Sequence, residues 1–212
     1  MISNAYLYNN CFQERINTKI SSEGFCSDSW SDNDISDIKE SIKQFYIPEQ
    51  NHTCPYCQQR FLTNNGRLWD IEHIIPRQTQ VGFMFTPQNL CVCCPDCNSH
   101  KGYKKTTTSI AKKTLPTKSH LYLIVHPHFD KYDDHIEVIE PGYLYRAKSK
   151  KGENTMYVCA LNRFYQFSGY NSAVATDHRL MMLANSLSSA QGEEEKRQIR
   201  REMISISLRA NI

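Results

Sequence analysis

The sequence has no long hydrophobic run. Its longest clearly apolar stretch, residues 121–125, is far shorter than the roughly 20 residues that a helix needs to cross a bilayer. The chain also lacks the basic and then apolar start of a secretory signal, because it begins with the polar segment MISNAYLYNN. These absences predict a cytoplasmic protein. A length of 212 residues predicts one compact body with appendages.

The chain also lacks the even number of cysteines that a complete set of disulfide bonds requires. The chain has nine, which in a reducing compartment are better explained as metal ligands, redox groups or free thiols. Four of them form two C-x-x-C pairs and predict one structural zinc ion: Cys54, Cys57, Cys94 and Cys97. Cys91 or Cys93 could replace Cys94 in principle, but only Cys94 repeats the spacing of the first pair. The other five cysteines are expected to be free thiols.

The patterning predicts an α+β protein with a zinc-stapled core, a small antiparallel sheet and flanking helices at both ends. Four parts are expected: a partly helical extension (residues 1–50), a core with the site chemistry (51–105), a basic linker with a β region (106–164) and a helical region (165–212).

Individual elements follow from periodicity and from turn residues. Isoleucines recur at helical spacing from Ile35 until Pro48, so a helix is expected there, after an irregular start of the chain. A break is expected near Gly192 in the C-terminal helices. The expected strands are residues 121–125, 135–140, 142–147 and 155–161.

Charge is unevenly distributed along the chain. Residues 99–119 hold six lysines and no acidic residue, directly after the second cysteine pair. A lysine run is often only a solvated surface, but its position beside a metal site favours contact with nucleic-acid phosphates. The predicted phosphate contacts are Lys101, Lys104 and Lys105. Arg77 is either a further phosphate contact or a surface residue, and the sequence does not decide between these alternatives.

The segment WDIEHIIP, residues 69–76, and two later asparagines carry the catalytic pattern. Glu72 and Asn98 offer the oxygen ligands that a hard divalent ion prefers. His73 is placed to take a proton from the attacking water, and Asn89 can orient His73 through the backbone or the ring. Together these residues predict metal-assisted hydrolysis of a phosphodiester bond.

These motifs resemble the HNH, or ββα-metal, nuclease family over roughly residues 51–105. The resemblance implies a β-hairpin with His73 near the end of its first strand, Asn89 in the intervening loop, and a helix that begins near Cys97 and carries Asn98. It also implies a catalytic Mg²⁺ or Mn²⁺ ion. Many members have Asp before the histidine and His as the last motif residue, where this chain has Glu72 and Asn98; both variants occur in the family.

A looser resemblance covers residues 126–135 and the segment ALNR at residues 160–163. It is to the HNH nucleases of Septu and retron-linked anti-phage systems. By that resemblance the chain would be a nuclease effector that acts with an ATPase partner, and in retron versions with a reverse transcriptase and its RNA–DNA product. The substrate would be DNA, or RNA such as a tRNA.

Three alternative functions remain open at the level of sequence. One is a non-catalytic zinc-ribbon module that binds nucleic acid, and another is a free-standing HNH nuclease of a restriction or mobile-element system. The third, a dithiol oxidoreductase, would need only one C-x-x-C pair. Within residues 126–135, the histidines and aspartates could form a second metal site, but turn-forming acids and a histidine that supports a strand are the more common use of such residues.

Overall fold

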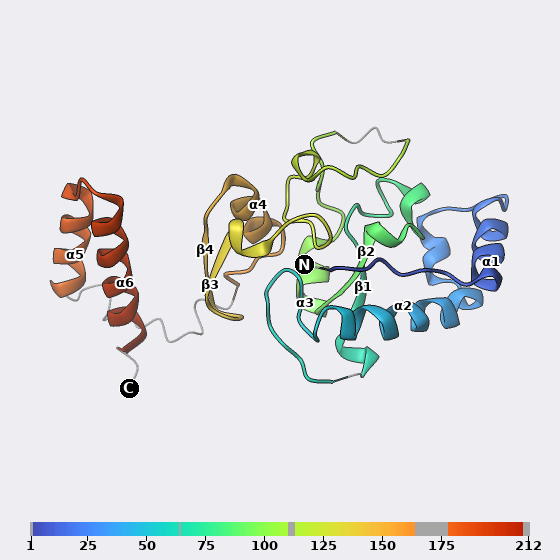
Figure 1. The fold of residues 1–212 in the computed structure, drawn as a ribbon, viewed down its shortest axis with the longest axis horizontal. Helices are drawn as coiled ribbons and strands as arrows, with labels where there is room; N and C mark the ends of the chain where they lie inside the picture. The colour runs from blue at the N-terminus through green and yellow to red at the C-terminus, as the bar shows by residue number, and fades with distance from the viewer. Residues whose placement is uncertain (1, 64, 110–112, 164–177, 210–212) are drawn as a thin grey trace. The chain divides into compact units, whose positions relative to one another are not determined.

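A two-stranded antiparallel hairpin and a short helix form the centre of the chain (Figure 1). Strand β1 (Asp70–His73) pairs with strand β2 (Leu90–Cys93), with Asp70 opposite Cys93 and His73 opposite Leu90. Helix α3 (Pro95–Lys101) follows directly and packs on β1. Proline suits the first position of α3, and Gly102, with φ of +50°, allows the chain to leave the helix. The predicted ββα arrangement and the α+β class are confirmed.

The computed structural model describes residues 2–63, 65–109, 113–163 and 178–209. It divides into two units, residues 1–162 and 163–212, which are described separately. Among the described residues, no helix combines the length and the apolar character needed to cross a membrane.

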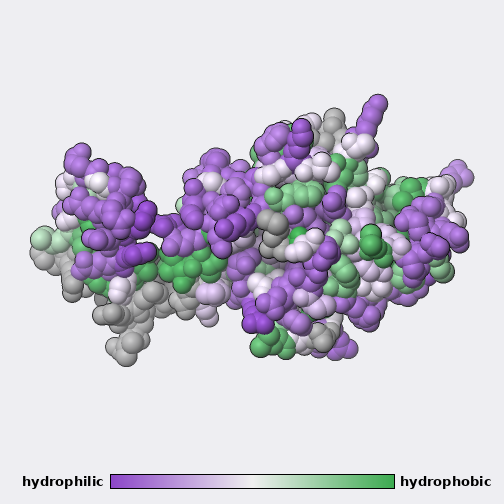
Figure 2. Space-filling model, in the orientation of Figure 1, coloured by the Kyte–Doolittle hydropathy of each residue, from purple (hydrophilic) through white to green (hydrophobic). Residues whose placement is uncertain are grey.

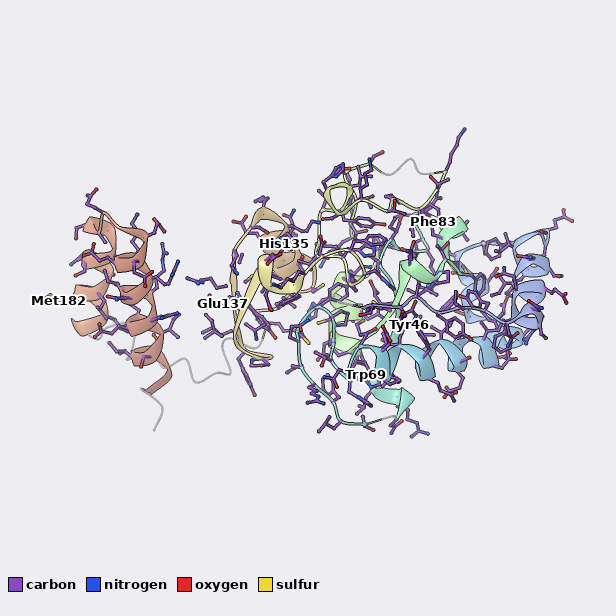
Figure 3. The ribbon with its side chains drawn as sticks, viewed as in Figure 1. Tyr46, Trp69, Phe83, His135, Glu137 and Met182 are labelled. Carbon is purple, nitrogen blue, oxygen red and sulfur yellow. The ribbon has the colours of Figure 1, made fainter. Side chains whose placement is uncertain are left out.

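The predicted helix of the extension is present as α2 (Ser36–Glu49), with Pro48 in its last turn. Its apolar face packs against both strands of the hairpin, and Tyr46 points from α2 toward them (Figures 1 and 3). The Tyr46 hydroxyl donates to the carbonyl of Pro87 at 2.9 Å, just before β2. The buried residues of this face are Ile38, Ile42, Tyr46 and Ile47.

Helix α1 (Asn10–Ile20) was not predicted, although the stretch that indicated an irregular start, residues 21–34, has only turns and 3-10 helix. Its apolar pattern is weak, since Ile16 is its one buried residue. Polar contacts supply the rest: the Asn9 side chain caps the first turn, accepting from Phe12 at 2.8 Å, and Arg15 forms an ion pair with Asp37 at the start of α2. Such contacts between segments leave no periodic signal in the sequence.

A second hairpin confirms two of the predicted strands. Strand β3 (Ile136–Glu140) pairs antiparallel with β4 (Leu144–Ala147). The strand predicted at residues 155–161 was wrong, because α4 (Lys150–Val158) occupies most of it. The Ser149 side chain caps α4, and Gly152 lets the helix approach the backbone closely: an added Cβ would lie 2.0 Å from the carbonyl oxygen of His135.

The strand predicted at residues 121–125 was also wrong. This segment forms only an isolated bridge between Thr107 and Tyr122. Ile124 and Val125 are nevertheless buried in the core. Burial explains the apolar run, but no partner strand lies beside it in the described structure to complete a ladder.

The C-terminal unit is helical, as predicted. Helices α5 (His178–Ser189) and α6 (Glu193–Arg209) contact each other, and Gly192 lies in the break between them. Three glutamates lie in the first turn of α6 and stabilise the helix, because negative charge is favourable at the partly positive N-terminal end of a helix. The face of these helices seen in Figure 2 is mostly hydrophilic, and Met182 of α5 is 57% exposed. The first part of the predicted helical region, residues 165–177, lies outside the described residues.

Candidate active site and zinc centre

Four cysteines converge, two from the loop before β1 and two from the start of α3. The sulfur atoms of Cys54, Cys57, Cys94 and Cys97 all lie within 4.8 Å of one another, and all four residues are buried. The sulfurs of Cys57 and Cys94 are 3.7 Å apart. Four thiolates in a closed cluster fit a tetrahedral zinc ion, which supports the predicted structural zinc site.

The preference for Cys94 over its neighbours is confirmed by this cluster. Cys91 and Cys93 lie on β2 and are not among the converging sulfurs. Burial raises the pKa of both thiols well above the usual value, as it does for Cys159. These three side chains are therefore neutral, unreactive parts of the core.

His73 ends strand β1 and is almost fully buried, with 7% of its surface exposed. Its Nε2 lies 3.1 Å from the carbonyl oxygen of Met84, which requires a proton on Nε2 and leaves Nδ1 as an acceptor. The ring meets the Trp30 indole edge to face, with centroids 4.5 Å apart. Burial, with smaller effects of Arg77 and Lys101, lowers the pKa of His73 to about 3. The imidazole is thus neutral at physiological pH, the form that a general base needs.

Asn89 holds the loop that positions His73. The Asn89 side chain is fully buried, accepts from the backbone N–H of Ile75 at 2.7 Å, and donates to the carbonyls of Ile75 and Phe83, each at 3.1 Å. These bonds fix the turn that presents the Met84 carbonyl to His73. The predicted role of Asn89, to orient His73 through the backbone or the ring, stays a prediction, and the observed contacts are all with the backbone.

Lys101 does not lie at a phosphate-binding surface, so the predicted role was wrong. Its side chain is fully buried, and its ammonium lies 2.5 Å from Glu72 Oε1 and donates to the carbonyl of His73 at 2.9 Å. Tyr56 also donates to Glu72, at 3.1 Å. Burial raises the pKa of Glu72, and the Lys101 ammonium opposes that rise. A buried lysine needs such a partner, since an unpaired buried charge is strongly unfavourable.

Asp70, which was not among the predicted site residues, lies beside Asn98 and lines the same cavity as His73. The Asn98 side-chain amide donates to Asp70 Oδ2 at 2.8 Å, whereas the Glu72 carboxylate is bonded to Lys101 and Tyr56. Residues two apart on a strand share a face, so the alternation of Asp70 and Glu72 on β1 was a usable signal. The Asp70 carboxylate and the Asn98 amide are both of a kind that binds a divalent ion, and it is the Asn98 amide nitrogen that faces Asp70 in this structure.

A cavity of about 590 Å³ opens onto these groups. Asp70, Glu72, His73 and Asn98 all line it. The remaining lining side chains come from three stretches of the chain, within residues 30–43, 70–78 and 98–103. The structure therefore brings three of the four predicted catalytic residues, Glu72, His73 and Asn98, to one cavity, whereas Asn89 is buried and does not line it.

Of the other three predicted phosphate contacts, one lines the cavity and two do not. Arg77 lines the cavity, and its Nε donates to the carbonyl of Ser27 at 3.0 Å. Lys104 and Lys105 are exposed and are not among the cavity-lining residues. The Lys104 ammonium donates to the carbonyl of Val158 at 3.0 Å and so connects the end of α3 to α4.

The histidines and aspartates of residues 126–135 have structural contacts. Within the described residues, the four-cysteine cluster is the one group of His, Cys, Asp or Glu side chains arranged to hold a metal. Asp130 pairs with Lys151 at 2.9 Å, and His128 Nε2 donates to the carbonyl of Leu90 at 2.7 Å. His128 thus supports the start of β2, which favours the structural alternative.

Comparison with known proteins agrees with this site. Residues 54–104 match the family model of the HNH endonuclease. Over 125 residues, the chain is 29% identical to the Septu protein PtuB of Bacillus thuringiensis, a match that covers 59% of this chain and 42% of that relative. The chain therefore spans less than half the length of this curated relative. No solved structure matches it.

Proposed function

We propose that this chain, which carries an HNH endonuclease domain at residues 54–104, is a metal-dependent endonuclease that hydrolyses phosphodiester bonds of nucleic acids. The observation that carries the proposal is the environment of His73. Its ring is neutral, held through Nε2 by the Met84 carbonyl, and lines a cavity together with Asp70 and Asn98. A purely structural zinc ribbon has no need for such a group in an open cavity.

In the proposed reaction, His73 Nδ1 accepts a proton from a water molecule. The water oxygen forms a bond to phosphorus while the bond between phosphorus and the leaving oxygen breaks, and the leaving oxygen takes a proton from solvent water. Asn89 keeps the His73 ring in place through residues 83–84. Arg77 is proposed to contact a phosphate oxygen from the cavity wall.

Asp70 and Asn98 are the groups proposed to hold the catalytic Mg²⁺ or Mn²⁺ ion, because their polar atoms lie side by side at the cavity. Such an ion, when bound, stabilises the negative charge that develops on the phosphate. Glu72 remains a predicted ligand. In the structure, its carboxylate is already bonded to Lys101 and Tyr56.

The proposed biological setting is an anti-phage defence system in the cytoplasm, with an ATPase as partner. Support comes from the likeness to a Septu protein and from the sequence resemblance at residues 126–135. The resemblance to retron-linked systems extends the proposed partners to a reverse transcriptase and its RNA–DNA product. The proposed substrate is DNA or RNA, since contacts of this kind reach phosphate and sugar rather than base edges.

The purified chain should cleave nucleic acid in Mg²⁺ or Mn²⁺ and lose that activity in EDTA, while it keeps its tightly bound zinc. The assay uses duplex DNA, single-stranded DNA and total RNA, with the chain alone and co-expressed with the ATPase encoded beside it. Cleavage only in the co-expressed sample would support a restrained effector. Binding without cleavage in every sample would instead favour the zinc-ribbon module.

Asp70→Asn and Glu72→Gln should separate the two carboxylates. We expect Asp70→Asn to weaken Mn²⁺ binding, measured by calorimetry, with little change in melting temperature, because Asp70 is only partly buried. Glu72→Gln leaves the Lys101 ammonium buried without its carboxylate and should lower the stability by about 3 kcal/mol. Unchanged Mn²⁺ affinity in Asp70→Asn, together with its loss in a folded Glu72→Gln, would return the ligand role to Glu72.

A further inference from the structure

We propose that helix α2 of the N-terminal extension binds the nucleic-acid backbone at the active site, through Lys39 and Lys43. This inference rests on the proposed nuclease function and assigns part of its substrate-binding surface. Both lysines line the same cavity as His73. Both lie outside residues 54–104, the part of the chain that matches the HNH model.

The two lysines are four residues apart on α2, so their side chains project from the same face of the helix. Each is half-buried. The Lys43 ammonium donates to the carbonyl of Gly66 at 2.8 Å, and the Lys39 ammonium donates to the carbonyl of Trp30 at 3.1 Å. An ammonium has three donors, and a second bond of Lys39, to the carbonyl of Asp32, is long at 3.3 Å. Donor capacity therefore remains for phosphate oxygens.

Helix α2 is held firmly enough to present these side chains in fixed positions. Its residues Ile38 and Ile42, next to the two lysines, are fully buried, and the helix contacts both strands of the catalytic hairpin. Since β1 ends in His73, the lysines and the proposed base belong to one packed unit. Little conformational entropy of these lysines is therefore lost when a nucleic-acid strand binds, which favours affinity.

The balance of charges at the cavity also favours an anionic ligand. Three basic side chains line it: Lys39, Lys43 and Arg77. Of the acids that line it, Glu72 is paired with Lys101, and Asp70 faces Asn98 at the proposed metal site. This leaves Asp70, whose neighbour Asn98 carries no charge, and the exposed Glu40 to oppose the three cations. The excess of positive charge beside the proposed base suits the phosphates that flank the cleaved bond.

The test compares Lys39→Gln/Lys43→Gln with Lys150→Gln, a lysine of α4 that is 82% exposed and does not line the cavity. Affinity is measured in EDTA by fluorescence anisotropy, with labelled duplex DNA, single-stranded DNA and hairpin RNA, over a range of salt concentrations. We expect the double variant to bind several-fold more weakly and to reduce the slope of log K against log salt by about two. Lys150→Gln should match the unmodified protein.

Zinc content and melting temperature confirm that each variant folds, and Lys43→Arg should keep the affinity because it keeps the charge. Equal affinity and equal salt slope of the double variant and the unmodified protein, or no binding of any probe by the unmodified protein, would overturn the inference. Because affinity is measured without cleavage, failure of this inference can be told apart from failure of the proposed function, which would show as absence of metal-dependent cleavage.

Discussion

His73→Ala should cleave nucleic acid about 10² to 10⁴-fold more slowly than the unmodified protein, because it removes the proposed general base. Its zinc should remain at one equivalent, since the four cysteine ligands are untouched. Affinity for nucleic acid in EDTA should also remain, because the proposed phosphate contacts come from other side chains. Cleavage rate, zinc content and melting temperature, measured on the same preparations, check the three expectations.

His128→Ala is the matched control. His128, like His73, is a histidine whose Nε2 is bonded to a backbone carbonyl of the hairpin region, that of Leu90. It does not line the cavity. Both variants should lose some stability, and each lost kcal/mol lowers the melting temperature by about 2–4 °C in a protein of this size. Only His73→Ala should show a rate loss larger than its loss of stability explains. Cleavage by His73→Ala at nearly the original rate would refute the mechanism.

Cys97→Ser should give poorly folded protein with little zinc. Cys97 supplies one of the four converging sulfurs from the first turns of α3, and the helix also carries Asn98. Binding of a structural zinc ion contributes folding free energy on the order of 10 kcal/mol, so loss of a ligand should disorder α3 together with the site that it carries. Zinc per chain, melting temperature and soluble yield are the measurements.

Cys93→Ser is the control for this substitution. Cys93 is equally buried and lies one residue before a zinc ligand, but its sulfur is outside the cluster. This variant should keep one zinc per chain and suffer only the cost of a hydroxyl in the core. A folded Cys97→Ser protein with full zinc content would show that the four-cysteine assignment is wrong.

The sequence by itself determined the features that depend on spacing along the chain. Two C-x-x-C pairs are enough to specify four zinc ligands, and the zinc site in turn fixes where β2 ends and α3 begins. The position of Asn98 just after a cysteine ligand follows from the second pair, whereas the position of His73 at a strand end was implied by the resemblance to HNH nucleases. The isoleucine period located α2, because helical periodicity is a local property.

Only the tertiary structure decided which polar groups meet. A lysine run next to a metal site predicts a phosphate-binding surface, but the fold buries Lys101 against Glu72. The pairing of Asp70 with Asn98, and the approach of Lys39 and Lys43 to the same cavity, join segments far apart in sequence. The run at residues 121–125 was apolar because it is buried, not because it pairs in a sheet. Contacts between side chains depend on how distant segments pack in three dimensions, and such contacts leave no periodic pattern in the local sequence.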